Sequence, residues 1–280
     1  MKVQFGNKVM SSFLLYLDNT ILRVGEAYTN HSGLFYADAD NKYNGYYGYS
    51  APYKQLVSDQ SVTGATVMSG AYVNSSFTQT NVHINHYNGQ VFFGSDQGSA
   101  KISGNYSVKD FNINMTNKAE QELLFETKFK IRPKTTQVET GLHPNQSTYP
   151  AIYVKNMGGE NRPWAFGGMD NTVINTRCIV LSDSAFKLDA VCSILKDTAR
   201  DSVFIIEPSG LPFNALGLTS TGAGFNYTGM LTGAHGYDNA YIKDVTITSN
   251  IPQFSNNSIN SEIQAAFVDF RLETPRMGTS

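Results

Sequence analysis

The sequence TVINTRCIVLSDSAFKLDAVCSILKDTARDSVFIIE, from Thr172 to Glu207, predicts a strand, a helix and a second strand in succession. β-Branched and apolar residues dominate Val173–Leu181, which is typical of a buried strand. Ser182 to Ser184 then break the pattern with side chains that can accept hydrogen bonds at a helix start. Beyond them, apolar residues recur at helical spacing, at Leu188, Val191, Cys192 and Leu195. This unit predicts a core, and nothing in it indicates a reaction.

Length and charge favour a two-domain protein with a weakly charged surface. The chain has 280 residues, enough for two domains that each bury a core. Its 21 basic and 23 acidic residues leave a net charge of −2, so no general positive field would hold nucleic acid. Only 16% of the residues are charged, whereas roughly 25% is usual. Such a surface is easily covered by neighbouring subunits, although a low-charge β-rich protein without partners fits the composition equally well.

The two cysteines and the apolar runs bear on the cellular setting. Cys178 and Cys192 lie among apolar neighbours in the central unit, which favours buried free thiols, with a strand-to-helix disulfide as the alternative. The N-terminal apolar run is too short for a secretion signal, and no segment approaches the roughly 20 apolar residues of a membrane span. We expect no membrane partner.

The N-terminal part predicts an antiparallel β-sandwich or barrel over residues 1–134. Phe13–Leu17 and Thr20–Val24 flank Asp18-Asn19, a pair that suits a hairpin turn. Gly33–Tyr53 is rich in Tyr and Gly and predicts a long surface loop. Short strands with turns between them follow, at Thr66–Val73, Ser76–Thr80, Val82–Tyr87, Gln90–Phe93 and Gly104–Met115. Asn88-Gly89 gives the strongest hairpin signal and Asn74-Ser75 a weaker one.

A polar segment separates this part from an α+β domain over residues 149–280. Phe125–Ile131 alternates like a strand, and residues 135–148 are polar and unpatterned, as expected of a linker. Two glycine-rich segments, Asn156–Asn171 and Pro208–Asn239, predict long loops. Strands are expected at Tyr149–Val154, Ala240–Thr248 and Ile263–Glu273. The fold class is therefore mixed α/β and β-rich, with the strand-helix-strand unit at the centre of the second domain.

No residue pattern indicates catalysis or metal binding. His83 and His86 are three apart on an expected strand, which puts them on opposite faces. Asp38 and Asp40 lack the glycine and the glutamate of a calcium-binding loop. Nucleotide-binding glycine motifs and nucleophile motifs are absent from the sequence. We expect no enzyme activity, no cofactor and no metal.

Five segments resemble parts of a virion structural protein of tailed bacteriophages of the T4-like marine type, as found in cyanophages: SFLLYLDNTIL, YSAPYKQLVSDQSVTGATVMSG, INHYNGQVFF, YSVKDFNI and NTRCIVLSDSAFKLDAVCSILKD. The resemblance covers most of the chain and brings no catalytic motif. The second half also resembles the small α/β fold of tail-terminator and neck proteins. The β-rich first domain departs from a minimal terminator, so the baseplate, the collar and the capsid surface remain alternatives.

The resemblance implies a structural component of the virion, a ring-forming neck, tail-terminator or tail-completion protein at the head–tail junction. Its partners would be copies of itself in a ring and other neck, tail or baseplate proteins. Sequence-specific nucleic-acid binding is not expected, and any contact with DNA in the channel would be passive. The expected contact residues are aromatic and lie in the three predicted loops: Tyr43, Tyr46, Tyr47, Tyr49, Trp164, Phe166, Phe213, Phe225 and Tyr227.

Two other function classes fit the same residues. A glycan-binding or receptor-binding module would use the tyrosine-rich stretch and Trp164. A carbohydrate-cleaving enzyme would use carboxylates such as Asp96 or Asp170. Incubation with a host-surface polysaccharide separates them, because a pure ring component neither binds nor cleaves it.

Overall fold

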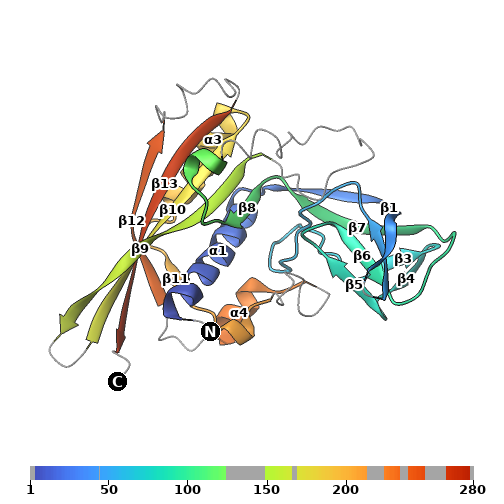
Figure 1. Ribbon diagram of the computed structural model, residues 1–280, viewed down its shortest axis with the longest axis horizontal. Coiled ribbons are helices and arrows are strands. Elements are labelled where there is room, and N and C mark those ends of the chain that lie inside the picture. Colours follow the sequence, from blue (N-terminus) through green and yellow to red (C-terminus); the bar gives the residue numbers. More distant parts are fainter. Residues whose placement is uncertain are drawn as a thin grey trace.

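Two β units lie side by side along the long axis of the molecule (Figure 1). The computed structural model describes residues 4–43, 45–123, 149–165, 169–212, 224–233, 239–249 and 263–277. One unit is a seven-stranded antiparallel sheet that folds over on itself, and the other is a six-stranded sheet backed by helices. The expected fold class, mixed α/β and β-rich with a sandwich-like or barrel-like first part, is confirmed.

The first unit, here called the sandwich, is built from one long strand and six short ones. Its strand order is β4-β3-β7-β1-β2-β6-β5. The strands are β1 (Tyr28–Tyr43), β2 (Tyr46–Ser50), β3 (Ala71–Val73), β4 (Ser76–Thr78), β5 (Val82–Asn85), β6 (Gln90–Phe93) and β7 (Ile102–Lys109). The start of β1 pairs with β7 from Tyr28↔Lys109 to Phe35↔Ile102, and its end pairs with β2. β1 thus belongs to both layers, and they close over one apolar core.

The predicted loop over Gly33–Tyr53 is wrong, because this stretch forms most of β1 and all of β2. Phe35 and Tyr49 point into the core, whereas Leu34 and Tyr36 are exposed. This is the two-residue alternation of a half-buried strand, and aromatic residues favour strands. The stretch was mistaken for a loop because its aliphatic content is low.

Both predicted hairpins of the sandwich exist, but the weaker sequence signal forms the tight two-residue turn and the stronger one forms a longer loop. Asn74 and Ser75 both have positive φ, 47° and 72°, and form a two-residue turn between Val73 and Ser76. The other hairpin pairs Asn85 with Gln90, so its loop has four residues, of which Gly89 has φ 65°. A side chain at Gly89 would meet the Tyr53 carbonyl oxygen at 2.0 Å, so only glycine fits there.

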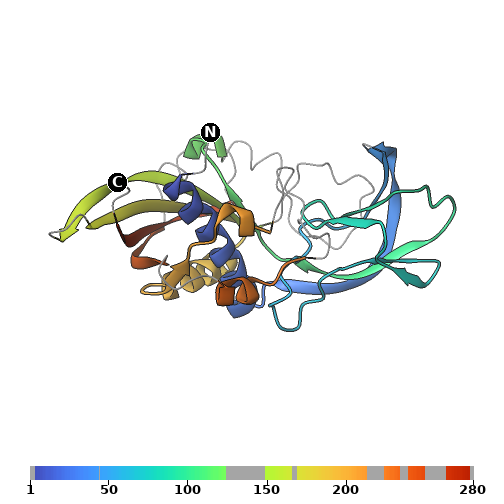
Figure 2. The same cartoon turned by 90° about the horizontal axis from the view of Figure 1, so that it is seen from below.

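The second unit, here called the helix-backed sheet, has the strand order β11-β12-β13-β10-β9-β8. Its strands are β8 (Asn112–Met115), β9 (Ala151–Ala165), β10 (Met169–Ser182), β11 (Ser202–Phe204), β12 (Asn239–Ser249) and β13 (Gln264–Met277). Helices α1 (Phe5–Val24) and α3 (Ala185–Asp197) pack on one face. A 3-10 turn η1 (Pro208–Gly210) and a short helix α4 (Tyr227–Gly233) lie beside α1 (Figures 1 and 2).

The predicted hairpin at Phe13–Val24 is wrong, because these residues belong to helix α1. Val9, Phe13, Leu17 and Ile21 repeat every four residues and are fully buried. Phe13 meets Phe270 of β13 edge to face, with ring centroids 5.0 Å apart. Asp18 and Asn19 do not form a turn and are themselves buried. The helical spacing of apolar residues continues back to Val9, which lies before the stretch predicted as a hairpin.

The predicted loop over Asn156–Asn171 is also wrong. β9 runs through to Ala165, and β10 begins at Met169. Gly158, at φ 92°, sits in a bulge between the pairs Ile174↔Gly159 and Thr176↔Asn156, so the glycines bend the strand without ending it. Of the predicted loop Pro208–Asn239, the described parts include η1 and α4, and residues 213–223 and 234–238 lie outside the described residues.

The strand-helix-strand unit appears as β10, α3 and β11, with Leu195 and Val191 buried and Leu188 packed against the core. Cys178 and Cys192 are free and buried, as predicted. The sheets do not follow the expected order of domains along the chain. α1 packs on the helix-backed sheet and β8 pairs with β9, so the sandwich is an insertion between them. The expected strand Phe125–Ile131 and the linker 135–148 lie outside the described residues.

Candidate assembly site

An arm of three strands extends from the helix-backed sheet, beyond α1 and α3 (Figure 1). It consists of the end of β9, the start of β10 and the end of β13. β10 holds the arm together, since Met169 faces Ala165 on one side and Met277 on the other. The outer strand is exposed at every position from Asn156 to Pro163. The arm therefore carries backbone and side chains that no other part of the described chain covers.

Two strand edges of the helix-backed sheet are open along much of their length. β8 pairs with β9 only from Ala151 to Val154. β11 pairs with β12 only from Asn239 to Tyr241, and Ile242 is bonded to the Arg200–Asp201 turn. Among the described residues, no strand pairs with the outer edge of β9 after Val154 or of β12 after Ile242. Unpaired strand edges can accept a strand of another chain.

A groove of about 360 Å³ lies at the root of the arm, where the start of α1 meets β9 and β10. Gly158, Gly159 and Thr172 contribute to its wall. On the β13 side, Arg276 places its guanidinium over the Phe5 ring, 4.7 Å from the centroid. The groove is a recess beside the open edge of β9, with one cationic side chain in its lining.

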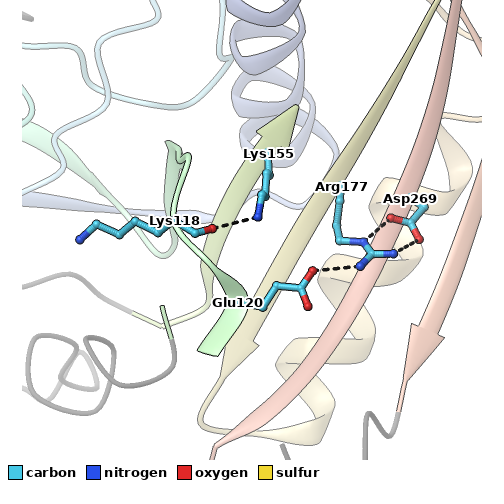
Figure 3. Close-up of polar contacts among 5 residues, drawn as sticks. All are labelled: Lys118, Glu120, Lys155, Arg177 and Asp269. Carbon is cyan, nitrogen blue, oxygen red and sulfur yellow. Dashed lines mark hydrogen bonds and ion pairs between the residues drawn. The ribbon is translucent and has the colours of Figure 1, made fainter. Parts of the chain in front are cut away.

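A clamp of charged residues holds a short segment on the face of the sheet opposite the helices (Figure 3). Arg177 of β10 donates to both carboxylate oxygens of Asp269 on β13, at 2.7 and 3.0 Å, and to Glu120 at 2.9 Å. Lys155 of β9 donates to the Lys118 carbonyl at 3.0 Å. These hydrogen bonds raise the pKa of Arg177, the bond to Asp269 contributing most. The clamp fixes Lys118–Glu120 over the face of the sheet opposite the helices. The carboxylates of Glu120 and Asp269 both accept hydrogen bonds from Arg177 within it.

A buried polar joint ties the sandwich to the helix-backed sheet through α1. Lys109 of β7 donates to both Asp18 oxygens at 2.6 and 2.7 Å, and both side chains are nearly buried. Asp59 accepts from Asn19 at 2.7 Å and from the Tyr227 backbone N–H at 3.0 Å. The joint therefore fixes α1, the sandwich and α4 in one arrangement, because buried polar groups lose stabilisation when their partners leave.

Three described residues of reactive types, Cys178, Cys192 and His86, are held in unreactive states. Burial raises the pKa of Cys192 to about 11 and that of Cys178 further, which disfavours a thiolate at either. His86 is buried, its ring Nε2 lies 3.1 Å from the Met68 carbonyl oxygen, and burial lowers its pKa to about 4. Within the described ranges, no three potential metal ligands cluster. His83 lies apart from His86 and packs against Tyr46.

One outer face of the sandwich combines aromatic and polar side chains. Tyr46 is partly exposed and meets His83 edge to face, at 5.1 Å between ring centroids. Nearby, Asp38 accepts hydrogen bonds from Ser50 and from Gln90, the latter at 3.1 Å. Aromatic rings beside fixed carboxylate and amide groups are suited to sugar rings and hydroxyl groups.

The structure separates the nine expected contact residues. Tyr46 is partly exposed, Tyr47 is half-buried, and Tyr49 is buried against Phe93. Tyr227 is buried with Leu15 and Ile206 in one apolar cluster, and Phe225 is partly buried against it. The backbones of Tyr43 and Trp164 lie in β1 and β9, but their side chains lie outside the described set, as do Phe166 and Phe213 entirely.

Neither the open edges nor the polar joint was predicted from the sequence. Gly158 and Gly159 favour a loop in the sequence, so the strand edge that they belong to in β9 was not predicted. β12 was predicted as a strand, but which described strands lie beside it depends on the sheet topology, and local sequence patterns do not reveal that. Asp18 and Asn19 were assigned to a turn, so their partners Lys109 and Asp59 were not sought.

The sequence matches no protein-family model and no curated protein. Of the described helices, none is both long and apolar enough to cross a bilayer. The function therefore has to be argued from the geometry of this chain.

Proposed function

We propose that this chain is a structural component of a tailed-phage virion that forms a ring at the head–tail junction, as a neck, tail-terminator or tail-completion protein. The observation that carries the proposal is the helix-backed sheet, whose described strands leave open edges on both sides and an exposed arm. A contact between two different surfaces, repeated around an axis, closes into a ring or continues as a filament. Two different open edges on one sheet supply such a contact.

The internal polar joint and the weak charge support the same role. A ring subunit must keep its shape while neighbours bind, and the Asp18–Lys109 and Asn19–Asp59 contacts hold the two β units together. A net charge of −2 suits a protein that surrounds DNA and makes only passive contact with it. The resemblance of five sequence segments to T4-like virion proteins supports a tailed phage as the setting of this role.

The test has two parts. Native mass spectrometry and negative-stain electron microscopy of the purified protein should find closed rings, and cryo-electron microscopy of virions should place the chain in a ring at the neck. A protein that stays monomeric at all concentrations and is missing from purified virions would refute the proposal. Density for this chain at the baseplate, collar or capsid surface would support a structural role in the virion and refute its position at the head–tail junction.

A glycan-binding virion module is the second candidate, because of the sandwich face with Tyr46, His83 and Asp38. Titration with host-surface polysaccharide, followed by calorimetry, separates the two functions. Binding that Tyr46→Ala abolishes while ring formation persists would support this second role. Tyr87→Ala is the matched control, since Tyr87 is exposed to a similar degree and no described contact joins it to Asp38.

A further inference from the structure

We propose that β12 of one copy pairs antiparallel with β9 of the next copy, so that the subunits of the ring share one continuous sheet. This inference rests on the ring-forming function proposed above and names the contact that builds the ring. The free edge of β9 spans Asn156–Ala165, and that of β12 spans Lys243–Ser249. The two stretches are similar in length, and each lies at the outside of the described sheet.

The residues of the β12 edge favour pairing with another strand. From Val245 to Ser249 the sequence is Val-Thr-Ile-Thr-Ser, in which β-branched residues prevail. Natural proteins protect free edges with lysine, proline or bulges, and this stretch has none of them after the bulge at Lys243. Thr246 and Thr248 are exposed, whereas Val245 and Ile247 pack partly against the core. Such an edge is suited to a partner strand.

The β9 edge offers the complementary half. Asn156–Arg162 contains neither lysine nor proline, and Pro163 comes only near the tip of the arm. The bulge at Gly158 interrupts the edge, so the regular part that can pair begins at Gly159. Glu160 and Arg162 form an ion pair with each other, so the strand brings no net charge toward its partner. Lys243 and Asp244 likewise offset one another at the start of the β12 edge. Pairing would therefore bring together two nearly neutral strands.

Direction and position also match. β9 is antiparallel to β10, β10 to β13, and β13 to β12, so β12 runs opposite to β9. A copy rotated about a ring axis keeps the sense in which each strand runs along that axis, so its β12 would meet β9 in the antiparallel sense. This mode excludes a two-fold dimer, in which each edge would meet its own equivalent.

The open edges are offset along the strands. Through the ladders, the β9 edge lies level with Met169–Thr176 of β10, whereas the β12 edge lies level with Val180 down to about Ile174. The offset is about five residues over four strands. With strands about 4.8 Å apart and about 3.3 Å per residue, it corresponds to strands tilted by roughly 40° to the ring axis, as in closed β-barrels.

Paired cysteines test the inference. Thr248→Cys is combined in turn with Asn156→Cys, Glu160→Cys, Asn161→Cys or Arg162→Cys, and the assembled protein is oxidised and run on a non-reducing gel. The native Cys178 and Cys192 are buried and stay silent. We expect one register to give a ladder of covalent oligomers that ends at the ring, because opposed strand residues lie within disulfide distance. The double variant Thr248→Cys with Thr80→Cys, on the exposed sandwich surface, should give none.

The direction of pairing is tested by moving both cysteines. If Thr248 cross-links to one β9 residue, Thr246→Cys should cross-link two residues further toward Ala165, as antiparallel strands require. Rings that persist without any β9–β12 cross-link would overturn this inference and leave the ring itself intact. Covalent dimers from single β9 cysteines would overturn it in favour of a two-fold contact. Protein that never assembles would refute the ring and this contact together.

Discussion

The sandwich and the helix-backed sheet solve the same packing problem in opposite ways. In the sandwich, β1 takes part in both layers, and the side chains of short strands close over a core that includes Phe35, Tyr106 and Val91. In the other unit the strands are long, and α1 and α3 bury one face with Phe13 and Leu195. The first unit uses its own strands to cover its apolar surface. The second needs helices for one face, and among the described residues it leaves long strand edges free, whereas the edge strands of the sandwich, β4 and β5, have only 3 and 4 residues.

This difference separates stability from assembly. The sandwich needs no partner chain to bury its apolar residues, because its own strands enclose its core. Within the part of the chain that the structure describes, the helix-backed sheet keeps unused backbone hydrogen-bonding capacity along β9 and β12. A partner chain is expected to meet the second unit, while the first remains available for another role.

Truncation at the helix–sheet contact should have the largest effect. Phe13→Ala removes a fully buried ring packed on Phe270, and we expect it to lower the free energy of unfolding by about 3–5 kcal/mol. Leu195→Ala should cost roughly 2–5 kcal/mol for the same reason. Urea unfolding followed by circular dichroism measures both. The control is Phe186→Ala on α3, whose side chain is 84% exposed and whose loss should change stability by less than about 0.5 kcal/mol. Equal effects at Phe13 and Phe186 would contradict the packing of α1.

Acid should weaken the sandwich through His86. Burial lowers the pKa of His86 from 6.5 to about 4, so the unfolded chain takes up a proton at a higher pH than the folded chain. Its contribution to stability is complete above about pH 6.5 and falls as the pH drops, by roughly 3 kcal/mol at pH 4. Urea midpoints of the wild type and His86→Gln should converge between pH 7.5 and pH 5. His83→Gln, at an exposed ring, is the matched control, and profiles of the wild type and His86→Gln that stay parallel would exclude this assignment.

The polar joint should couple the unfolding of the sandwich to the unfolding of the helix-backed sheet. Asn19→Ala removes a donor to buried Asp59, with an expected loss of about 1–3 kcal/mol. Labelling of Cys178 and Cys192 reports only on the helix-backed sheet, whereas circular dichroism reports on both units. We expect the two unfolding curves to coincide in the wild type and to separate in Asn19→Ala. Asn105→Ala, on the exposed surface of the sandwich, should keep them together, and separate curves in the wild type would mean that the joint does not couple the units.

The smallest effect should be a gain within the sandwich. Ser75 has φ 72°, a left-handed conformation that glycine adopts without strain, so Ser75→Gly should stabilise the protein by about 0.5–1 kcal/mol. Ser103→Gly, inside β7, should have the opposite sign, because glycine weakens a strand. Thermal melting of the two variants measures the pair. A loss of stability in Ser75→Gly would mean that the turn between β3 and β4 has another geometry.

The parts of the fold that were predictable have strong local signals. β10 and α3 show a change from β-branched runs to helical spacing at Ser182–Ser184, and β6 ends where Gly94 follows Phe93. α1 was missed because Thr20–Val24 is β-branched and apolar over a short window, although the helical period becomes clear when Val9 is included. A wider window would have corrected it.

The candidate site was less accessible from the sequence. Among the described strands, β12 has no neighbour on its outer side after Ile242, because β11 pairs only with its start, and this is a relation between segments some forty residues apart. Asp59 is buried and the Lys109 side chain nearly so, because α1 lies against them, and no local pattern distinguishes them from surface residues. Aromatic content drew attention to Tyr227, which the chain uses for its own core.

The register Tyr28↔Lys109 has a consequence for how this protein can change. The chain enters and leaves the sandwich at two residues that face each other on neighbouring strands, about 5 Å apart. Any domain whose two ends lie that close could be spliced in at this point without moving α1 or β8. Val57 and Val62, which reach from the sandwich into the core beneath α1, are the residues that such an exchange would have to replace. With them compensated, the outer domain could diversify, or carry a foreign cargo, at a rate independent of the sheet that it decorates.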